Sequence, residues 1–161
     1  MPDVDVDRLI PIVTGVQLNA ELGDRPLAYR IESAARELLA RLIERPSPDE
    51  PPRLSAVVVS DVFYLNHDAL QTRPTISIGG PGVNALSAAL VNELPTVVTI
   101  ENVLVVQMDL EWNDARCAVW GMNHLDTVRA VDTFIAKGYL DMFAQGVVEQ
   151  LDADADTDAD E

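Results

Sequence analysis

The sequence is poor in the residues that build disulfide frameworks and metal centres. Cys117 is the single cysteine, and His67 and His124 are the only histidines. One cysteine excludes an internal disulfide framework, and none of these three residues has a partner at a spacing typical of a zinc site. We therefore predict no metal site, and nothing in the sequence points to a cofactor.

Long apolar runs are also missing. No stretch is long enough to cross a membrane, and the acidic start of the chain, residues 1–7, does not resemble a signal peptide. The hydrophobic content of 48% and the charged content of 24% are typical of a globular domain. We expect a soluble, cytoplasmic protein with an acidic lead over 1–7, a single domain over 8–151 and a disordered acidic tail over 152–161.

Basic residues are scarce. The sequence has 11 Lys and Arg and 27 Asp and Glu, which gives a formal net charge of −16. Phosphate contacts to nucleic acids and to anionic membranes need clustered Lys and Arg, so we expect neither partner. A local anion site built from backbone N–H groups remains compatible with this charge.

Hydrophobic periodicity predicts a mixture of strands and helices. The predicted strands are 9–14, 54–60, 75–78, 96–100, 103–109 and 116–120. The predicted helices are 25–44, with Asp24 as N-cap, then 81–94, 124–137 and 139–151, and a short helix over 68–72 within an irregular segment, 61–74. This order predicts a three-layer α/β domain, Rossmann-like or flavodoxin-like, with a mixed, mostly parallel sheet flanked by helices and a late antiparallel pair.

A glycine-rich turn, residues 79–82, joins a short strand to an apolar-periodic helix. Glycines permit a tight turn, and Pro81 suits the first turn of a helix. The product is a helix N-terminus that can hold an anion, with Asn84 facing the ligand. Neither a Walker loop nor a dinucleotide fingerprint is complete here. The alternative is a turn that only lets the helix pack on the sheet.

Residues 79–84 are similar to a Gly-Gly-Pro-x-x-Asn turn of archaeal surface-layer proteins, which carry it in an α/β domain. The resemblance covers these six residues. It implies an α/β setting for the turn and brings no activity with it.

In open α/β sheets, ligands bind outside the carboxyl ends of the strands. If the strands at 9–14, 54–60, 75–78 and 116–120 are parallel, their polar ends meet at one edge. The residues expected to bind a ligand there are Thr14, Gly15, Ser60, Gly79, Gly80, Gly82, Asn84, Gly121 and Asn123.

Two side chains at these strand ends are candidates for acid–base chemistry. His124 lies in the first turn of a helix, where the dipole disfavours the charged imidazolium, and Asp61 follows a buried strand. The structural alternatives are a polar residue at a helix start for His124 and a helix-capping carboxylate for Asp61. Asn123 and Asp126 read as caps of the same helix.

Three functions remain open at this stage. The first is a domain that binds a small anionic ligand, a nucleotide or a phosphorylated metabolite, at the carboxyl edge of the sheet. The second is an interaction or assembly module that forms a homo-oligomer or binds a protein partner, which an exposed apolar stripe on helix 139–151 would indicate. The third is a metal-independent hydrolase or glycosidic-transfer enzyme that uses Asp61 and His124.

Overall fold

The computed structural model describes residues 4–45, 47–109, 111 and 114–158. Trp112 and Asn113, between the predicted strands 103–109 and 116–120, lie outside the described residues. So does the end of the acidic tail, 159–161.

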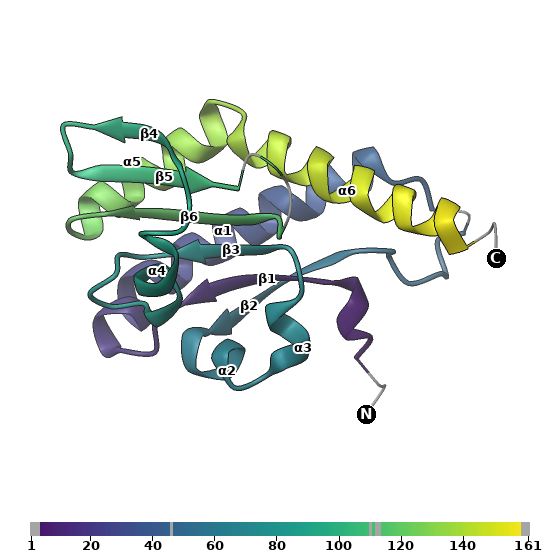
Figure 1. Ribbon diagram of the computed structural model, residues 1–161, viewed down its shortest axis with the longest axis horizontal. Coiled ribbons are helices and arrows are strands. Elements are labelled where there is room, and N and C mark those ends of the chain that lie inside the picture. The colour runs from purple at the N-terminus through teal and green to yellow at the C-terminus, as the bar shows by residue number, and fades with distance from the viewer. Residues whose placement is uncertain (1–3, 46, 110, 112–113, 159–161) are drawn as a thin grey trace.

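Helices and strands alternate over the first part of the chain, and a run of three strands precedes the last two helices (Figure 1). In chain order they are the 3-10 helix η1 (Val6–Arg8), β1 (Leu9–Thr14), α1 (Leu18–Leu42), β2 (Ser55–Ser60), α2 (Asp61–Leu65), α3 (Asp68–Gln71), β3 (Thr75–Ile78), α4 (Ala85–Leu90), β4 (Thr96–Ile100), β5 (Leu104–Met108), β6 (Arg116–Gly121), α5 (His124–Ala136) and α6 (Tyr139–Asp158).

The six strands form one mixed sheet in the order β2-β1-β3-β6-β5-β4. β1 is parallel to β2 and β3, and β3 is parallel to β6. β5 is antiparallel to both β6 and β4. The predicted three-layer α/β fold with a late antiparallel pair is therefore confirmed.

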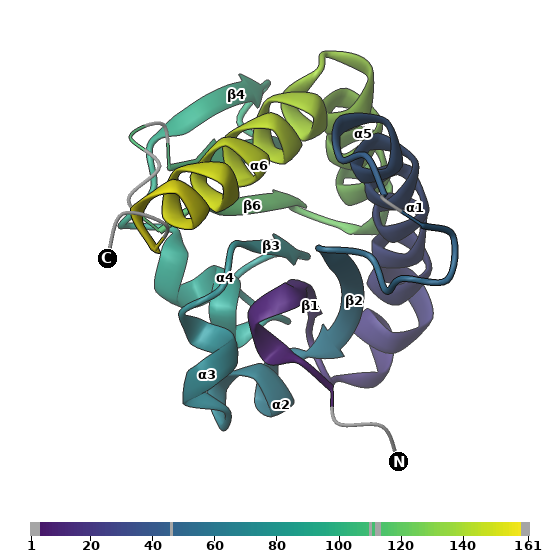
Figure 2. The same cartoon turned by 90° about the vertical axis from the view of Figure 1, so that its right-hand side faces the viewer.

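Helices α1, α5 and α6 cover one face of the sheet, and α2, α3 and α4 cover the other (Figure 2). Ile12 and Ile76 point to the face that α1, α5 and α6 cover, where the larger core lies. Val13 points the other way, into a smaller core with Leu86 of α4. Because side chains alternate along a strand, this places Thr14 on the α1 side of the sheet.

Helix α1 begins at Leu18, earlier than the predicted start at Arg25. The apolar stripe of α1 extends back to Ala20, which is buried, so packing on the sheet favours helix there. Pro26 consequently lies inside the helix rather than in its first turn. Asp24 is not the N-cap; it is a buried residue within α1.

Helix α4 is much shorter than the predicted helix over 81–94. Its N-cap is Asn84, whose extended backbone prevents the helix from starting earlier. The helix ends at Leu90, and Gln107 donates from Nε2 to the carbonyls of Val91 and Leu94. The glycine turn therefore precedes the helix and is not its first turn.

Two other segments also differ from the expectation. The irregular segment 61–74 contains α2 as well as the predicted short helix, which is α3. Helix α6 continues beyond Leu151 to Asp158, into the stretch whose composition predicts disorder.

Candidate functional site

The carboxyl ends of four parallel strands meet at one edge of the sheet. Thr14 is paired with Ser60 and with Ile78, and Ile78 is in turn paired with Val119. The turns after β1, β3 and β6 therefore emerge side by side, as the sequence predicts for parallel strands.

A cleft opens at this edge because the chain leaves neighbouring strands in opposite directions. After β1 the chain enters α1 on one face, and after β3 it enters α4 on the other. Such a switch point is where open α/β sheets bind ligands. The cleft has a volume of about 820 Å³ and lies between the start of α1, the turn 80–83 and residues 120–124.

Glycines let the turns approach closely around the cleft. A Cβ at Gly15 would lie 1.8 Å from the carbonyl oxygen of Val83, so this position admits no side chain. Gly79 has a φ of 99°, and a Cβ there would lie 2.5 Å from Oδ2 of Asp24. The turns after β1 and β3 are thus packed against one another and against α1.

Asn84, expected to face a ligand, is buried and fully engaged within the protein. Its Nδ2 donates to the carbonyls of Val13 and Ile78 and to Oγ of Ser77, at 2.9–3.1 Å. Its Oδ1 accepts from the backbone N–H groups of residues 86 and 87. Asn84 therefore joins β1, β3 and α4 and is absent from the cleft lining.

Asp61 closes the same helix start from the other side. Its Oδ2 accepts from the backbone N–H of Ala85 at 2.8 Å, and its Oδ1 accepts from that of Val62. Ser60 caps α2, because its Oγ accepts from the backbone N–H of Phe63. Asp61 and Asn84 together occupy the N–H groups of residues 85, 86 and 87. Helix α4 therefore offers no open anion site.

The proposed acid–base pair is not assembled. Asp61 follows β2 and His124 follows β6, and β1 and β3 lie between those two strands. Three strand spacings correspond to roughly 14 Å. His124 lines the cleft and Asp61 does not.

Asp24 is the carboxylate that does line the cleft. Its side chain descends from α1 towards Gly79 and only 6% of the residue is exposed. None of the described residues donates a hydrogen bond to its carboxylate, whose oxygens open to the cleft. Burial raises the pKa of Asp24 to about 6, and the charge of His124 acts in the opposite direction.

A signal for Asp24 is present in the sequence. It falls at helical spacing from Ala20, Ala28 and Ile31, all of which are buried. An acidic residue on the apolar stripe of a helix indicates a buried carboxylate, which is rare without a partner. The predicted helix starts at Arg25 and leaves Asp24 outside it, so this signal is lost.

His124 is the first residue of α5 and is exposed at the rim of the cleft. A Cβ at Gly23 would lie 2.8 Å from its Nδ1, so the imidazole rests against α1 at the residue next to Asp24. The structure thus brings His124 together with Asp24 instead of with Asp61.

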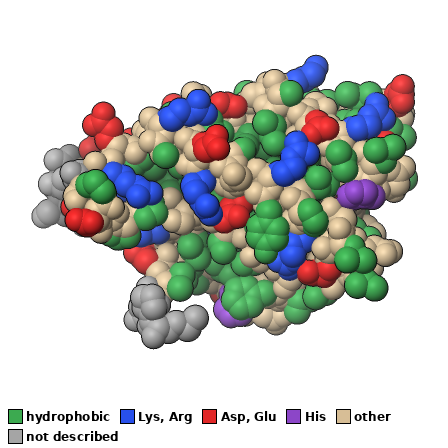
Figure 3. Space-filling view, turned by 180° about the vertical axis from the view of Figure 1, so that it is seen from behind, with side chains coloured by type: hydrophobic (Ala, Val, Ile, Leu, Met, Phe, Trp, Pro, Cys, Tyr) green, Lys and Arg blue, Asp and Glu red, His purple; other side chains and the backbone are tan. Residues whose placement is uncertain are grey.

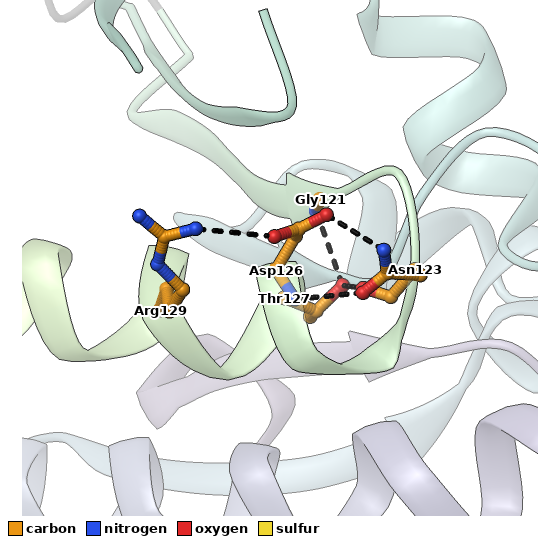
Figure 4. Close-up of polar contacts among 5 residues, drawn as sticks. All are labelled: Gly121, Asn123, Asp126, Thr127 and Arg129. Atoms are coloured by element: carbon orange, nitrogen blue, oxygen red, sulfur yellow. Dashed lines mark hydrogen bonds and ion pairs between the residues drawn. The ribbon is translucent and has the colours of Figure 1, made fainter. Parts of the chain in front are cut away.

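The start of α5 is held by its own polar groups (Figure 4). Oδ1 of Asn123 accepts from the backbone N–H of Asp126, and Nδ2 of Asn123 donates to Oδ2 of Asp126. Arg129 lies 3.4 Å from the other Asp126 oxygen, and Thr127 accepts from the N–H of Gly121. The predicted caps are confirmed, with the Asn123 side chain in place of its backbone N–H as the donor to Asp126.

Three further side chains of the parallel strands are Thr14 of β1 and Trp120 and Cys117 of β6. Thr14 is fully buried, and its Oγ1 has no hydrogen-bond partner among the described residues. Trp120 borders the cleft and donates from Nε1 to Oε1 of Gln107 at 3.3 Å. Cys117 is buried in β6, and burial raises the pKa of its thiol, as expected for a small core residue.

Comparison with protein-family models and with curated proteins finds no match for the chain. Within the described residues, no three His, Cys, Asp or Glu side chains come together as metal ligands. None of the described helices is both long and apolar enough to span a membrane.

Proposed function

We propose that the chain is a ligand-binding α/β domain that holds a small molecule in the cleft beside Asp24. The carboxylate of Asp24 carries the proposal, because it is largely buried, opens to the cleft and accepts no hydrogen bond from the described residues. A buried charged group without a hydrogen-bond donor is costly, and such groups concentrate at functional sites. A ligand that donates to Asp24 removes this cost when it binds.

The shape of the site supports the same proposal. The volume of about 820 Å³ falls in the range of small-molecule sites. Leu22, Trp120 and Met122 provide apolar surface, whereas Asp24 and His124 provide polar groups. Apolar walls with few polar groups are typical of pockets for small ligands.

The expected class of ligand, a nucleotide or a phosphorylated metabolite, stays a prediction. The helix start that motivated it is α4, whose first N–H groups are occupied by Asp61 and Asn84. Nucleotides and sugar phosphates therefore belong in a binding test beside neutral and cationic molecules.

Gly82→Trp is the variant that tests the site. Gly82 lines the cleft, and a Cβ at this position would meet no atom within 4 Å, so a side chain can be added there without a clash. We expect the indole to occupy part of the cleft. A ligand at 100 times its dissociation constant stabilises the wild type by about 2.7 kcal/mol. We expect thermal-shift assays to show this gain in the wild type and not in Gly82→Trp.

Ala89→Trp is the matched control, because Ala89 is exposed on α4 and does not line the cleft. It should respond to ligand as the wild type does. Equal stabilisation of all three proteins would place the ligand elsewhere and contradict the proposal.

An assembly role is the second candidate, and the rim of the cleft favours it. The exposed fraction is 67–72% for Leu18 and Leu22 of α1, Met122 of the turn after β6 and Leu125 of α5. Hydrophobic side chains border a hollow at the right-hand edge of Figure 3, the end at which the parallel strands terminate. The apolar stripe of α6 gives no such support, because Leu140, Phe143 and Val147 are buried against α1 and α5.

Self-association through this rim predicts a concentration-dependent mass. The double variant Leu22→Ser, Leu125→Ser should be monomeric at concentrations at which the wild type associates, because it removes the apolar area that drives contact. Analytical ultracentrifugation over a wide concentration range measures this. A wild type that stays monomeric throughout would exclude homo-oligomerisation through the rim.

A further inference from the structure

The charges that border the cleft are unbalanced. Asp24 contributes a carboxylate, and the described residues that line the cleft include no lysine or arginine. His124 is the ionisable group from another element whose charge acts on Asp24, and the glycine turn contributes none.

The arginines of the neighbouring helices are committed to other carboxylates. Arg25, next to Asp24 in the chain, forms two hydrogen bonds of 2.7 and 2.8 Å with Glu21. On α5, Arg129 pairs with Asp126. Asp24 thus has no lysine or arginine partner, and His124 is the cationic side chain of the protein that acts on it.

We propose that the cleft binds a small ligand with a primary ammonium group, which donates to the buried carboxylate of Asp24 while the apolar body of the ligand lies against Leu22, Trp120 and Met122. This inference rests on the proposed function and names the class of ligand. An ammonium group carries three donors and no acceptor, which suits a carboxylate that accepts nothing from the described protein.

The charge of the whole molecule acts in the same direction. A formal net charge of −16 attracts cations to the surface and repels anions. Inside the cleft the effect is stronger, because water is partly excluded around Asp24 and a charge pair is screened less there. Thr14, whose hydroxyl is unpartnered, lies on the sheet face that α1 covers.

The test is an NMR titration of the ¹⁵N-labelled full chain with three probes of matched shape. 2-Phenylethylamine carries the ammonium, 2-phenylethanol replaces it with a neutral donor, and phenylacetate replaces it with an anion. For a probe of this size we expect a Kd on the order of 1 mM for the amine. The amides of Gly80, Gly82, Met122 and His124 should shift, and the alcohol should bind at least about tenfold more weakly.

Two changes should weaken the amine without unfolding the protein. Asp24→Asn should raise the Kd at least about tenfold, because it removes the charge and keeps the shape. Lowering the pH from 7.5 to 5 should raise the Kd of the wild type about tenfold, because Asp24 then holds a proton. Glu37→Gln serves as the control that leaves the Kd unchanged, because Glu37 is an exposed carboxylate on the same helix and does not line the cleft.

The outcomes separate this inference from the proposed function. If the alcohol, phenylacetate or a nucleotide shifts the cleft amides and the amine does not, the ammonium inference is wrong and ligand binding stands. Equal affinity of Asp24→Asn and wild type for the amine also overturns the inference. If no probe and no metabolite in the thermal-shift panel affects these amides, both proposals fail.

Discussion

Asn84→Ala should destabilise the protein by about 3–5 kcal/mol, the largest loss that we expect from a single polar side chain. The substitution removes five hydrogen bonds in a buried site. It removes the bonds that the carbonyls of Val13 and Ile78 accept from Asn84, and it removes the side-chain acceptor of two N–H groups of α4. Chemical denaturation monitored by circular dichroism measures the change in the free energy of unfolding.

Ser60→Ala is the comparison that isolates the burial of Asn84. Both residues are N-caps, but Ser60 makes one capping bond, of 3.2 Å, at the exposed start of α2. Its loss should cost about 1 kcal/mol, the usual value for a cap. Similar losses in the two variants would mean that Asn84 is only a cap and does not hold β1 and β3 together.

The strands were predictable because each shows a local pattern that the fold does not override. The strands at 9–14, 75–78 and 96–100 have the predicted bounds in the structure. The helices were harder, because proline and glycine are ambiguous signals. Pro26 suggested a helix start and lies inside α1, and Pro81 suggested a helix start and lies in a turn before α4.

The position of the candidate site was predictable from the sequence, but the side chains that line it were not. Parallel strands bring their carboxyl ends together whatever side chains they carry, so the edge follows from the topology. Which side chains face the cleft depends on pairings between distant residues. For example, Asp61 accepts a hydrogen bond from the backbone of Ala85, and Asn84 donates one to the backbone of Val13. Only the three-dimensional structure shows these pairings.

Asp24→Asn should stabilise the protein at pH 8, by between about 1 and 3 kcal/mol, although it removes a charged group from the candidate site. Burial raises the pKa of Asp24 to about 6 from its ordinary value of 3.8. The ionised carboxylate is therefore less favourable in the folded chain than in the unfolded one. The difference corresponds to at most about 3 kcal/mol, because solvent in the cleft screens part of it. Asn keeps part of the cost of burying a polar group, which reduces the gain.

The pH dependence distinguishes this explanation from a change in packing. Below about pH 3.8 Asp24 is protonated in both states, so the variant and the wild type should have similar stability. The advantage of the variant should grow as the pH rises through about 4 to 6 and then stay constant, and at pH 8 it corresponds to a rise in Tm of about 3–10 °C. Glu21→Gln, one turn earlier on α1, should bring a small loss instead, because Arg25 pairs with Glu21 and holds the pKa of that carboxyl below its usual range.

If the wild type is more stable than Asp24→Asn at pH 8, the carboxylate of Asp24 already has a partner within the protein, and its proposed role in ligand binding is contradicted. The opposite result would mean that the sequence keeps a carboxylate that weakens the folded state. Residues that lower stability at a cleft are expected where binding or chemistry requires them, because a group that is satisfied by its own protein cannot be satisfied by a ligand. Stability gained on removing Asp24, together with ligand binding lost, would therefore locate the function of this domain at Asp24.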